Sequence, residues 1–308
     1  MAVADHSTVH HLADLGSWPA GGPSLAVIGH PVAHSLSPAI HNAALAALAA
    51  AEPSFRSWRY HKFDLAAEEL ATALPRFHAA GFAGLNVTVP HKEAVRQLVE
   101  EADALVRATG AANTLLRTAT GWRAANTDGG GLVDALRAEF GIGLAGQPVI
   151  LLGAGGAARA AAVQCLREGA AAVWIGNRGA GRLEALLAAL APLAGPIPVR
   201  GFALDQPPAG LPGGAVVINA TSLGLRPTDP APVELARLPS PGWVYEMIYN
   251  PPVTALLRQA AALGRPAANG RSMLVHQGAR SLSLWTGRTV PVDVMNRAAQ
   301  TALAALHP

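Results

Sequence analysis

The chain has 308 residues, of which 51% are hydrophobic and 14% charged, a balance that is typical of a globular protein and excludes a largely disordered one. The formal net charge is only +3, and the arginines are scattered without a basic run beside an aromatic platform, which argues against nucleic acid as a partner. The length favours two domains, each with its own core.

Several features indicate a cytoplasmic protein. The single cysteine, Cys165, has no partner within the chain, as expected in a reducing compartment. The first 20 residues contain Asp5 and Asp14 and lack the basic start of a signal peptide. No uncharged apolar run reaches the roughly 18 residues that a membrane span requires, so we expect no membrane association.

Strands and helices are expected to alternate from residue 24 onward, whereas residues 1–23 have no predicted structure. In the first part, strands are predicted at 25–29, 55–63, 84–89, 113–117 and 121–124, and helices at 38–51, 65–80 and from 90. Ser37 is well placed as the N-cap of the first helix, with Pro38 at the first helical position.

The second part continues the alternation. Strands are predicted at 148–152, 171–176, 215–219 and 243–247. Helices are predicted at 132–140, 182–193, 271–285 and 292–306, and a further helix is expected to follow a glycine loop and to end at about residue 168. Residues 205–214 are predicted to form a surface loop. This order predicts an α/β protein with mainly parallel sheets.

A glycine-rich loop between a predicted strand and a predicted helix indicates a dinucleotide site. Gly153, Gly155 and Ala158 fit the pattern G-x-G-x-x-G/A. The first glycine permits a tight turn, the second allows the backbone to approach a pyrophosphate, and the helix N-terminus offers N–H groups to the phosphates.

The end of the next strand distinguishes NADP from NAD. An NAD site usually has Asp or Glu about 20 residues after the glycine loop, to bind the ribose 2′-hydroxyl. This chain has Asn177 and Arg178 there, and Arg182 follows one turn later. Two guanidinium groups suit a 2′-phosphate, so we expect NADP; the alternative is that both are ordinary surface arginines.

Only two of the 23 Lys and Arg residues are lysines, Lys62 and Lys92. Because arginine does not readily release a proton, a lysine in this chain is a candidate proton donor and acceptor. Lys92 ends a run in which Asn86 and Thr88 point to the same face of a predicted strand. Lys62 lacks such neighbours and is interpreted as a residue on a solvated face.

Two further clusters carry possible site chemistry. Ser35 and Ser37 place two hydroxyls at a predicted helix N-terminus, which suits a carboxylate; an N-cap role alone would explain Ser37 but not Ser35. Asp128 follows Asn126 and Thr127 and precedes three glycines. The histidines, including His6, His10 and His11, lack the ordered spacing of a zinc site, so no metal is expected.

These motifs make the chain resemble the shikimate dehydrogenases. The segments that occur in the order seen in that family are 34–38, 86–92, 110–114, 126–129, 153–157, 177–178, 219–222 and 273–277. The resemblance covers about residues 24–308. It implies the NADPH-dependent, reversible reduction of 3-dehydroshikimate to shikimate, a step of aromatic amino-acid biosynthesis.

The resemblance also implies roles for individual residues. Lys92 and Asp128 would be the catalytic acid–base pair. The substrate-binding residues would be Ser35, Ser37, Asn86, Thr88, Asn113, Tyr249 and Gln277. The cofactor-binding residues would be Gly153, Ala154, Gly155, Gly156, Ala157, Asn177, Arg178, Arg182, Thr221, Met247 and Gly270.

The implied architecture is a substrate-binding and catalytic domain, 1–127 with 271–308, and a Rossmann-type NADP-binding domain, 128–270, in a monomer or homodimer. Alternatives are a quinate or aminoshikimate dehydrogenase of the same fold, a non-catalytic NADP-binding sensor, and a folate-type dehydrogenase. The chain departs from the usual family pattern at Ala112, Gly179, Glu246 and residues 271–272, which puts details of the cofactor site in doubt.

Overall fold

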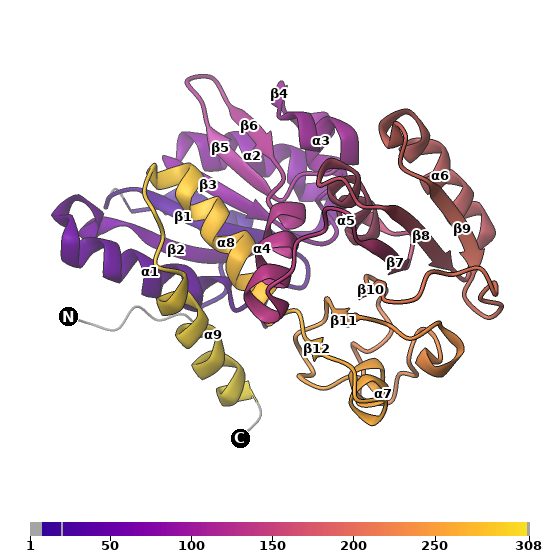
Figure 1. The fold of residues 1–308 in the computed structure, drawn as a ribbon. Coiled ribbons are helices and arrows are strands. Elements are labelled where there is room, and N and C mark those ends of the chain that lie inside the picture. Colours follow the sequence, from indigo (N-terminus) through magenta and orange to yellow (C-terminus); the bar gives the residue numbers. More distant parts are fainter. Residues whose placement is uncertain (1–7, 20, 307–308) are drawn as a thin grey trace. The chain divides into compact units, whose positions relative to one another are not determined.

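The computed structural model describes residues 8–19 and 21–306. The chain forms two compact units, the first comprising Met1–Thr127 with Val275–Pro308 and the second Asp128–Leu274. It passes from one unit to the other after Thr127 and again within helix α8 (Arg271–Thr286) (Figure 1). His6 lies outside the described residues.

The first unit is built on a six-stranded mixed sheet. Its strands are β1 (Ser24–Gly29), β2 (Arg59–Asp64), β3 (Phe82–Val87), β4 (Glu101–Ala102), β5 (Thr114–Arg117) and β6 (Trp122–Ala125). Their order is β2-β1-β3-β5-β6-β4, with β3, β5 and β6 antiparallel and the other pairs parallel. All six residues of β1 are buried, as expected for a central strand covered on both faces.

Helices cover both faces of this sheet. They are α1 (Ser37–Ala51), α2 (Leu70–Ala79), α3 (Ala104–Thr109), α9 (Val292–Leu306) and the later part of α8, with 3-10 turns at Leu12–Ser17, Pro53–Ser57, Ala67–Glu69 and Ala94–Leu98. Helix α8 is fastened to β5, because the indole N–H of Trp285 donates to the carbonyl of Leu115 at 2.9 Å. Helix α2 covers the opposite face (Figure 1).

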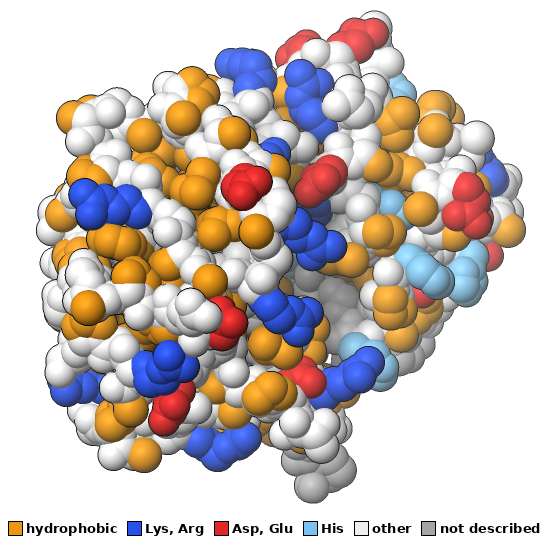
Figure 2. All heavy atoms as spheres, turned by 90° about the vertical axis from the view of Figure 1, so that its right-hand side faces the viewer, with side chains coloured by type: hydrophobic (Ala, Val, Ile, Leu, Met, Phe, Trp, Pro, Cys, Tyr) orange, Lys and Arg blue, Asp and Glu red, His pale blue; other side chains and the backbone are white. Residues whose placement is uncertain are grey.

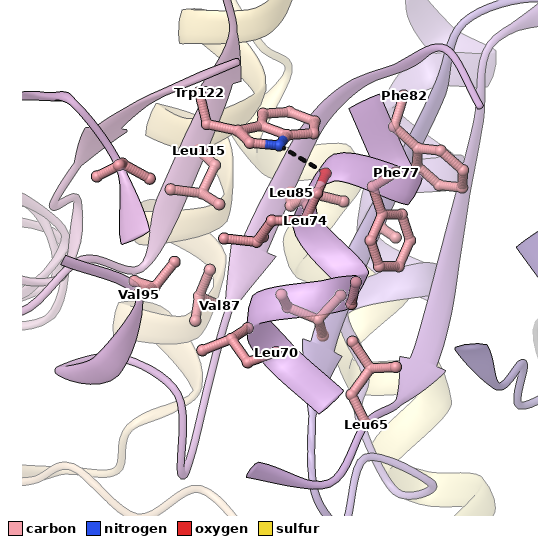
Figure 3. Close-up of a cluster of buried hydrophobic side chains, with 14 of the residues drawn as sticks. Leu65, Leu70, Leu74, Phe77, Phe82, Leu85, Val87, Val95, Leu115 and Trp122 are labelled. Carbon is pink, nitrogen blue, oxygen red and sulfur yellow. Dashed lines mark hydrogen bonds between the residues drawn. The ribbon is translucent and has the colours of Figure 1, made fainter. Parts of the chain in front are cut away.

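Beneath α2 lies an apolar core (Figure 3). Phe77 of α2 meets Phe82 of β3 edge to face, with ring centroids 4.8 Å apart, and Trp122 donates from its indole N–H to the carbonyl of Leu74 at 3.0 Å. Burial of each such side chain contributes about 1.5–3 kcal/mol, so this cluster holds α2 to the sheet. The indole hydrogen bond avoids an unsatisfied donor in the core.

The segment before β1, for which the sequence predicted no structure, contains the 3-10 turn Leu12–Ser17 and packs against the first unit. Leu15 is buried in the same core, and His10 packs against Trp18 at a centroid distance of 5.1 Å. The backbone N–H of His10 also donates to the carbonyl of Lys62 at 2.9 Å, which adds this segment to the edge of β2.

The second unit is a doubly wound parallel sheet. Its strands are β7 (Pro148–Leu152), β8 (Ala172–Asn177), β9 (Val199–Ala203), β10 (Val216–Asn219), β11 (Trp243–Glu246) and β12 (Ala267–Ala268). All pairs are parallel, in the order β12-β11-β10-β7-β8-β9. Counted within the unit from β9, this is the order 3-2-1-4-5-6 of dinucleotide-binding folds, which confirms the predicted Rossmann-type architecture.

Four helices accompany the sheet of the second unit in the described part of the chain. They are α4 (Asp128–Phe140), α5 (Gly156–Arg167), α6 (Ala180–Ala194) and α7 (Ala255–Ala262), with a 3-10 turn at Leu235–Arg237. The order of the sheet reverses between β7 and β10, so the loops after these two strands face a common crevice at their carboxyl ends.

Most predicted strands and helices are present, with two clear errors. Residues 55–58 do not belong to the second strand, because Pro53–Ser57 form a 3-10 turn that begins with a proline. The helix expected from Pro90 is also wrong, since the chain turns through His91 to Glu93 and then forms only the short turn Ala94–Leu98. Elements α3, β4, β9, α7 and β12 were not predicted.

Tertiary hydrogen bonds explain why no helix starts at Pro90. The carbonyl of Lys92 accepts from the N–H of Ala112 at 2.8 Å, so this acceptor is used by a distant segment. The His91 ring is buried and donates from Nε2 to the carbonyl of Leu65 at 2.8 Å. The turn that carries Lys92 is therefore fixed on both sides.

Candidate active site

The two serines at the start of α1 have different roles. Helix α1 begins at Ser37 itself, so the predicted N-cap role of this residue is wrong. The hydroxyl of the half-buried Ser35 instead accepts from the Ser37 N–H at 3.3 Å. The buried Ser37 side chain lies near the phenol of Tyr60, which leads into the interior of the first unit.

Asn86 occupies the centre of a buried polar network near the carboxyl end of β3. Its Oδ1 accepts from the Tyr60 hydroxyl at 2.7 Å, and its Nδ2 donates to the carbonyl of Asn113 and to Oγ of Ser281, each at 3.0 Å. Burial raises the pKa of Tyr60 well above its usual value, so the phenol remains a donor to Asn86.

Asn113, the residue before β5, extends the network to α8 and to Thr127, where the first stretch of the first unit ends. Its Nδ2 donates to Oγ1 of Thr127 at 2.9 Å and to Oε1 of Gln277 at 3.3 Å, and its Oδ1 accepts from the Thr127 N–H at 2.8 Å. The structure therefore brings together Asn86, Asn113 and Gln277 through a continuous set of hydrogen bonds.

Thr88 and Lys92 lie on the chain just beyond β3. Both side chains are half-buried. The Thr88 N–H donates to the carbonyl of Ile28 at 3.0 Å, and the Lys92 carbonyl receives the N–H of Ala112, the neighbour of Asn113. Thr88 and Lys92 are thus held close to the strand ends that carry the polar network.

Asp128 begins helix α4 in the second unit and directly follows Thr127 in the chain. Its carboxylate is buried at a helix N-terminus, where the helix dipole favours negative charge. Because Thr127 is bound to Asn113 through both its backbone and its side chain, the chain enters Asp128 from a fixed position in the first unit.

Lys62 is not the solvated residue that its sequence setting suggested. Only 5% of it is exposed, and Nζ donates to the carbonyl of Ala33 at 2.8 Å, in the loop that leads to Ser35. Its position on β2 places its stem inside the unit, which a single lysine between a histidine and a phenylalanine does not reveal.

The glycine loop after β7 is shaped for a phosphate group. Gly153 has φ +114°, and a side chain there would come within 3.0 Å of the Ala220 carbonyl in the loop after β10. Gly155 precedes α5, and residues 155–157 are exposed, so the first N–H groups of the helix face open space. This arrangement fits a dinucleotide pyrophosphate.

Two exposed arginines follow the carboxyl end of β8. Arg178 and Arg182 flank the start of α6, and Asn177 donates from Nδ2 to the carbonyl of Gly179 at 2.8 Å. Gly179 occupies the cap position of α6 without a side chain to serve as a cap. The two guanidinium groups place positive charge near the carboxyl end of β8.

A buried carboxylate joins the loops after β10 and β11. Glu246 accepts from Nδ2 of Asn219 at 2.9 Å, from the Ile248 N–H at 3.1 Å and from the Thr254 hydroxyl at 3.0 Å. Asn219 in turn accepts through Oδ1 from the N–H of Thr221 at 2.9 Å. Burial raises the pKa of Glu246, and its polar contacts offset only part of that effect.

Met247 and Gly270 approach each other closely. The Gly270 N–H donates to the carbonyl of Ile248 at 3.1 Å, and a side chain at Gly270 would overlap the Met247 carbonyl, so only glycine fits there. Tyr249 follows in the same loop of the second unit, where burial raises the pKa of its phenol. Tyr249 therefore belongs to the second unit and is not part of the polar network of the first unit.

The unusual Ser272 has a defined local role at the start of α8. Its hydroxyl lies 3.0 Å from the Tyr245 hydroxyl, which also accepts from the Met273 N–H at 3.1 Å. The phenol thereby provides a partner for one of the first N–H groups of the helix. The Ser272 side chain is directed to Tyr245 of β11.

Sequence reasoning missed several members of the polar network. Tyr60, Thr114 and Ser281 were not predicted to belong to the site, although each contacts Asn86 or a neighbour of it. The signal for Ser281 was available, because it lies four residues after Gln277 and therefore on the same face of α8.

Cys165 is fully buried in the second unit. Burial raises the pKa of the Cys165 thiol to about 12, which suits a small core residue. Residues 8–19 and 21–306 contain no group of three His, Cys, Asp or Glu that could hold a metal, and none of their helices could span a membrane. On the face shown in Figure 2, basic side chains lie among hydrophobic and acidic ones.

A doubly wound sheet with an open glycine loop, attached to a separate unit with a polar side-chain network, defines a dinucleotide-dependent dehydrogenase with its own substrate-binding unit. Residues 27–115 match the family model of the shikimate dehydrogenase substrate binding domain, and residues 270–300 match that of the shikimate 5′-dehydrogenase C-terminal domain. The chain belongs to the shikimate dehydrogenase family.

Individual relatives agree over most of the chain. A shikimate dehydrogenase (NADP(+)) of Symbiobacterium thermophilum is 41% identical over 288 residues, which cover 92% of this chain and 95% of the relative. The shikimate 5-dehydrogenase of Thermus thermophilus, solved in complex with NADP(H) and shikimate, is 36% identical, with a TM-score of 0.78 and coverage of 91% of this chain and 100% of that one.

The fold also accommodates other substrates. The quinate dehydrogenase of Corynebacterium glutamicum, solved in complex with NAD, is 27% identical, with a TM-score of 0.81 and coverage of 91% of this chain and 99% of that one.

Proposed function

We propose that this chain catalyses the reversible, NADP-dependent reduction of 3-dehydroshikimate to shikimate, in the cytoplasm and as a monomer or homodimer. The observation that carries the proposal is the convergence of Asn86, Asn113 and Gln277 from three distant segments in one hydrogen-bonded network. The first unit is proposed to bind the substrate and the second to bind NADP.

The chemistry of the first unit suits a small polyhydroxylated acid. Amide groups such as those of Asn113 and Gln277 can both donate to and accept from ring hydroxyls. Ser35 and Ser37 provide hydroxyls at the start of α1, where the helix dipole favours a carboxylate. Thr88, Asn86 and Tyr249 are also proposed to bind the substrate.

The second unit suits NADP. Gly153, Gly155 and the exposed backbone through Ala157 would bind the pyrophosphate, and Ala154 and Gly156 belong to the same loop. Arg178 and Arg182, beside Asn177, would bind the 2′-phosphate. Thr221, Met247 and Gly270 line the loops after β10 and β11 and before α8, and are proposed to contact the nicotinamide half.

When bound, NADPH supplies a hydride to the ketone carbon of the substrate. Negative charge then grows on the ketone oxygen, and the Lys92 ammonium is proposed to stabilise this charge and to donate the proton that completes the alcohol. In the direction of oxidation Lys92 accepts that proton again. Asp128 is proposed to accept a hydrogen bond from the reacting group or from Lys92 and to orient it.

An absorbance assay at the NADPH band tests the proposal. Purified protein is offered shikimate or quinate, each with NADP or with NAD. We expect turnover with shikimate and NADP. Turnover with quinate or NAD at a similar rate would assign the chain to the quinate-type branch and contradict the roles of Arg178 and Arg182. No turnover in any of the four would contradict the catalytic proposal and favour an NADP-binding sensor.

A further inference from the structure

Ser281 contacts four members of the polar network, although no role follows for it from the family motifs. It lies on α8 and is fully buried. Its hydroxyl oxygen is 3.0 Å from Nδ2 of Asn86, 2.8 Å from Oγ1 of Thr114 and 3.1 Å from Oγ1 of Thr127, and it donates to the carbonyl of Gln277 at 3.1 Å.

We propose, on the basis of the proposed function, that Ser281 is a positioning residue. It fixes the substrate-binding amide of Asn86 and the segment that leads into Asp128 relative to Gln277. A hydroxyl has one proton and two acceptor sites, so it can satisfy three of these four neighbours at once. An alanine at this position can satisfy none.

The network joins segments that are far apart in the chain. Asn86 lies near the end of β3, Thr114 begins β5, and Thr127 is the last residue of the first passage between the units, while Ser281 lies on the helix of the second passage. The Thr127–Ser281 contact thus ties the two passages together inside the first unit. Because Asp128 follows Thr127, a shift of Thr127 moves the backbone of the proposed catalytic carboxylate.

A simpler role is also consistent with one of the contacts. Serine in a helix often donates to the carbonyl four residues earlier, which here is that of Gln277, and such a bond has only a local effect. That bond uses the proton of Ser281 and leaves two acceptor sites, which can serve two of the three neighbours Asn86, Thr114 and Thr127 at once. Thr286, which donates to the carbonyl of Leu282 at 2.7 Å, makes the local bond on the same helix outside this network and is the matched control.

The first test compares Ser281→Ala with Thr286→Val in steady-state kinetics. We expect Ser281→Ala to raise the KM for shikimate about five- to tenfold, the range of one lost buried hydrogen bond, and to lower kcat, without changing the KM for NADP. Thr286→Val should change none of the three. Equal kinetic constants for Ser281→Ala and the wild type would overturn the proposal.

A double-mutant cycle with Thr127→Val tests the link to the catalytic segment. Valine keeps the shape of threonine and removes the hydroxyl. We expect the two substitutions to be non-additive in kcat/KM, because either one breaks the same contact. Additive losses would overturn the link. Thr127→Val also serves as the readout if Ser281→Ala does not fold, since it should then show the same split between shikimate and NADP.

Amide hydrogen exchange of the free protein separates this inference from the proposed function. The Thr127 N–H is bound to Asn113, so we expect its exchange to accelerate in Ser281→Ala and not in Thr286→Val. Unchanged exchange would overturn the positioning role whatever the substrate is. Failure of the proposed function would appear instead as a wild-type protein that does not oxidise shikimate.

Discussion

The two proposed binding regions are built in opposite ways. In the first unit, side chains from four segments bind one another in a buried network, and the ligand would meet groups that are already fixed. In the second unit, the ligand would meet exposed backbone N–H groups at residues 155–157 and the exposed arginines Arg178 and Arg182. One region is therefore preorganised by neutral hydrogen bonds, and the other acts mainly through charge and helix geometry.

This difference teaches which property each region controls. A substitution in the buried network leaves other polar groups without partners, so it should alter orientation, turnover and stability together. A substitution of an exposed arginine leaves the fold intact and should alter only the affinity for an anion, with a strong dependence on salt.

Lys92→Ala should have the largest effect on turnover, and it provides the strongest test of the comparison between the two binding regions. Loss of the proton donor should reduce kcat by about 10²-fold or more, with little change in the KM for NADP. Lys92→Arg is the matched control, because it keeps the positive charge but does not readily release a proton, and it should also be slow. A large loss of substrate affinity with normal turnover would contradict the catalytic assignment.

Arg178→Ala should affect the second unit alone. We expect NADP binding to weaken about 10- to 100-fold, as for a lost charge-assisted hydrogen bond, while NAD binding and the melting temperature stay unchanged. The loss should shrink at high salt. Arg123→Ala, an exposed arginine on β6, controls for the change in net charge. Equal losses for NADP and NAD would remove the 2′-phosphate role.

The first unit should lose stability in acid through His41. This buried ring stacks on Tyr60 and donates to the Ser37 carbonyl at 2.8 Å, and burial lowers its pKa from 6.5 to about 4. The folded state therefore binds its proton less tightly than the unfolded state. The contribution of His41 to the free energy of unfolding is therefore fully present above pH 6.5 and is lost as the pH decreases toward 4. Between pH 7.5 and 5 the free energy of unfolding should fall by about 2 kcal/mol.

The measurement is urea unfolding from pH 7.5 to 5, followed by amide exchange so that each unit is read separately. His41→Gln should flatten the profile of the first unit by this amount, whereas His11→Gln, at an exposed position, should not. An unchanged slope in His41→Gln would mean that the buried network of the first unit tolerates the charged ring.

Glu246 should give the second unit a smaller dependence of the opposite sign. Its pKa is raised by burial, so the folded state binds the proton more tightly. Its contribution to the free energy of unfolding is fully present below about pH 4.5, the pKa of the carboxyl in the unfolded state. This contribution is lost as the pH rises through the higher pKa of the folded state. Relative to Glu246→Gln, the wild-type second unit should lose stability as the pH rises from 4 to 7 in the same exchange experiment. A relative gain would contradict the sign.

Much of this arrangement could be predicted from the sequence. The glycine loop and the apolar run before it were sufficient to predict the fold of the second unit. A dinucleotide fold depends on local backbone geometry, here at Gly153, and on strands that are apolar throughout. Asn86, Asn113 and Gln277 could be predicted as site residues, because each lies in a sequence motif of the family.

The contacts among these residues could not be predicted, because they depend on tertiary packing. Lys62 is buried only because β2 directs its side chain into the unit, and its neighbours in sequence do not indicate this. The turn after Pro90 was missed for the same reason, since the acceptor of a distant N–H is not visible in the local pattern.

The passage of the chain within α8 has a consequence for how such a protein can be recombined. The second unit is a single uninterrupted stretch, residues 128–274, whereas the first consists of two separate stretches that share one sheet face through Trp285. A gene fragment that ends at residue 127 would encode a sheet without the helix that covers β5. The second unit can therefore be exchanged as one cassette, whereas the first unit must be inherited as two pieces that stay together.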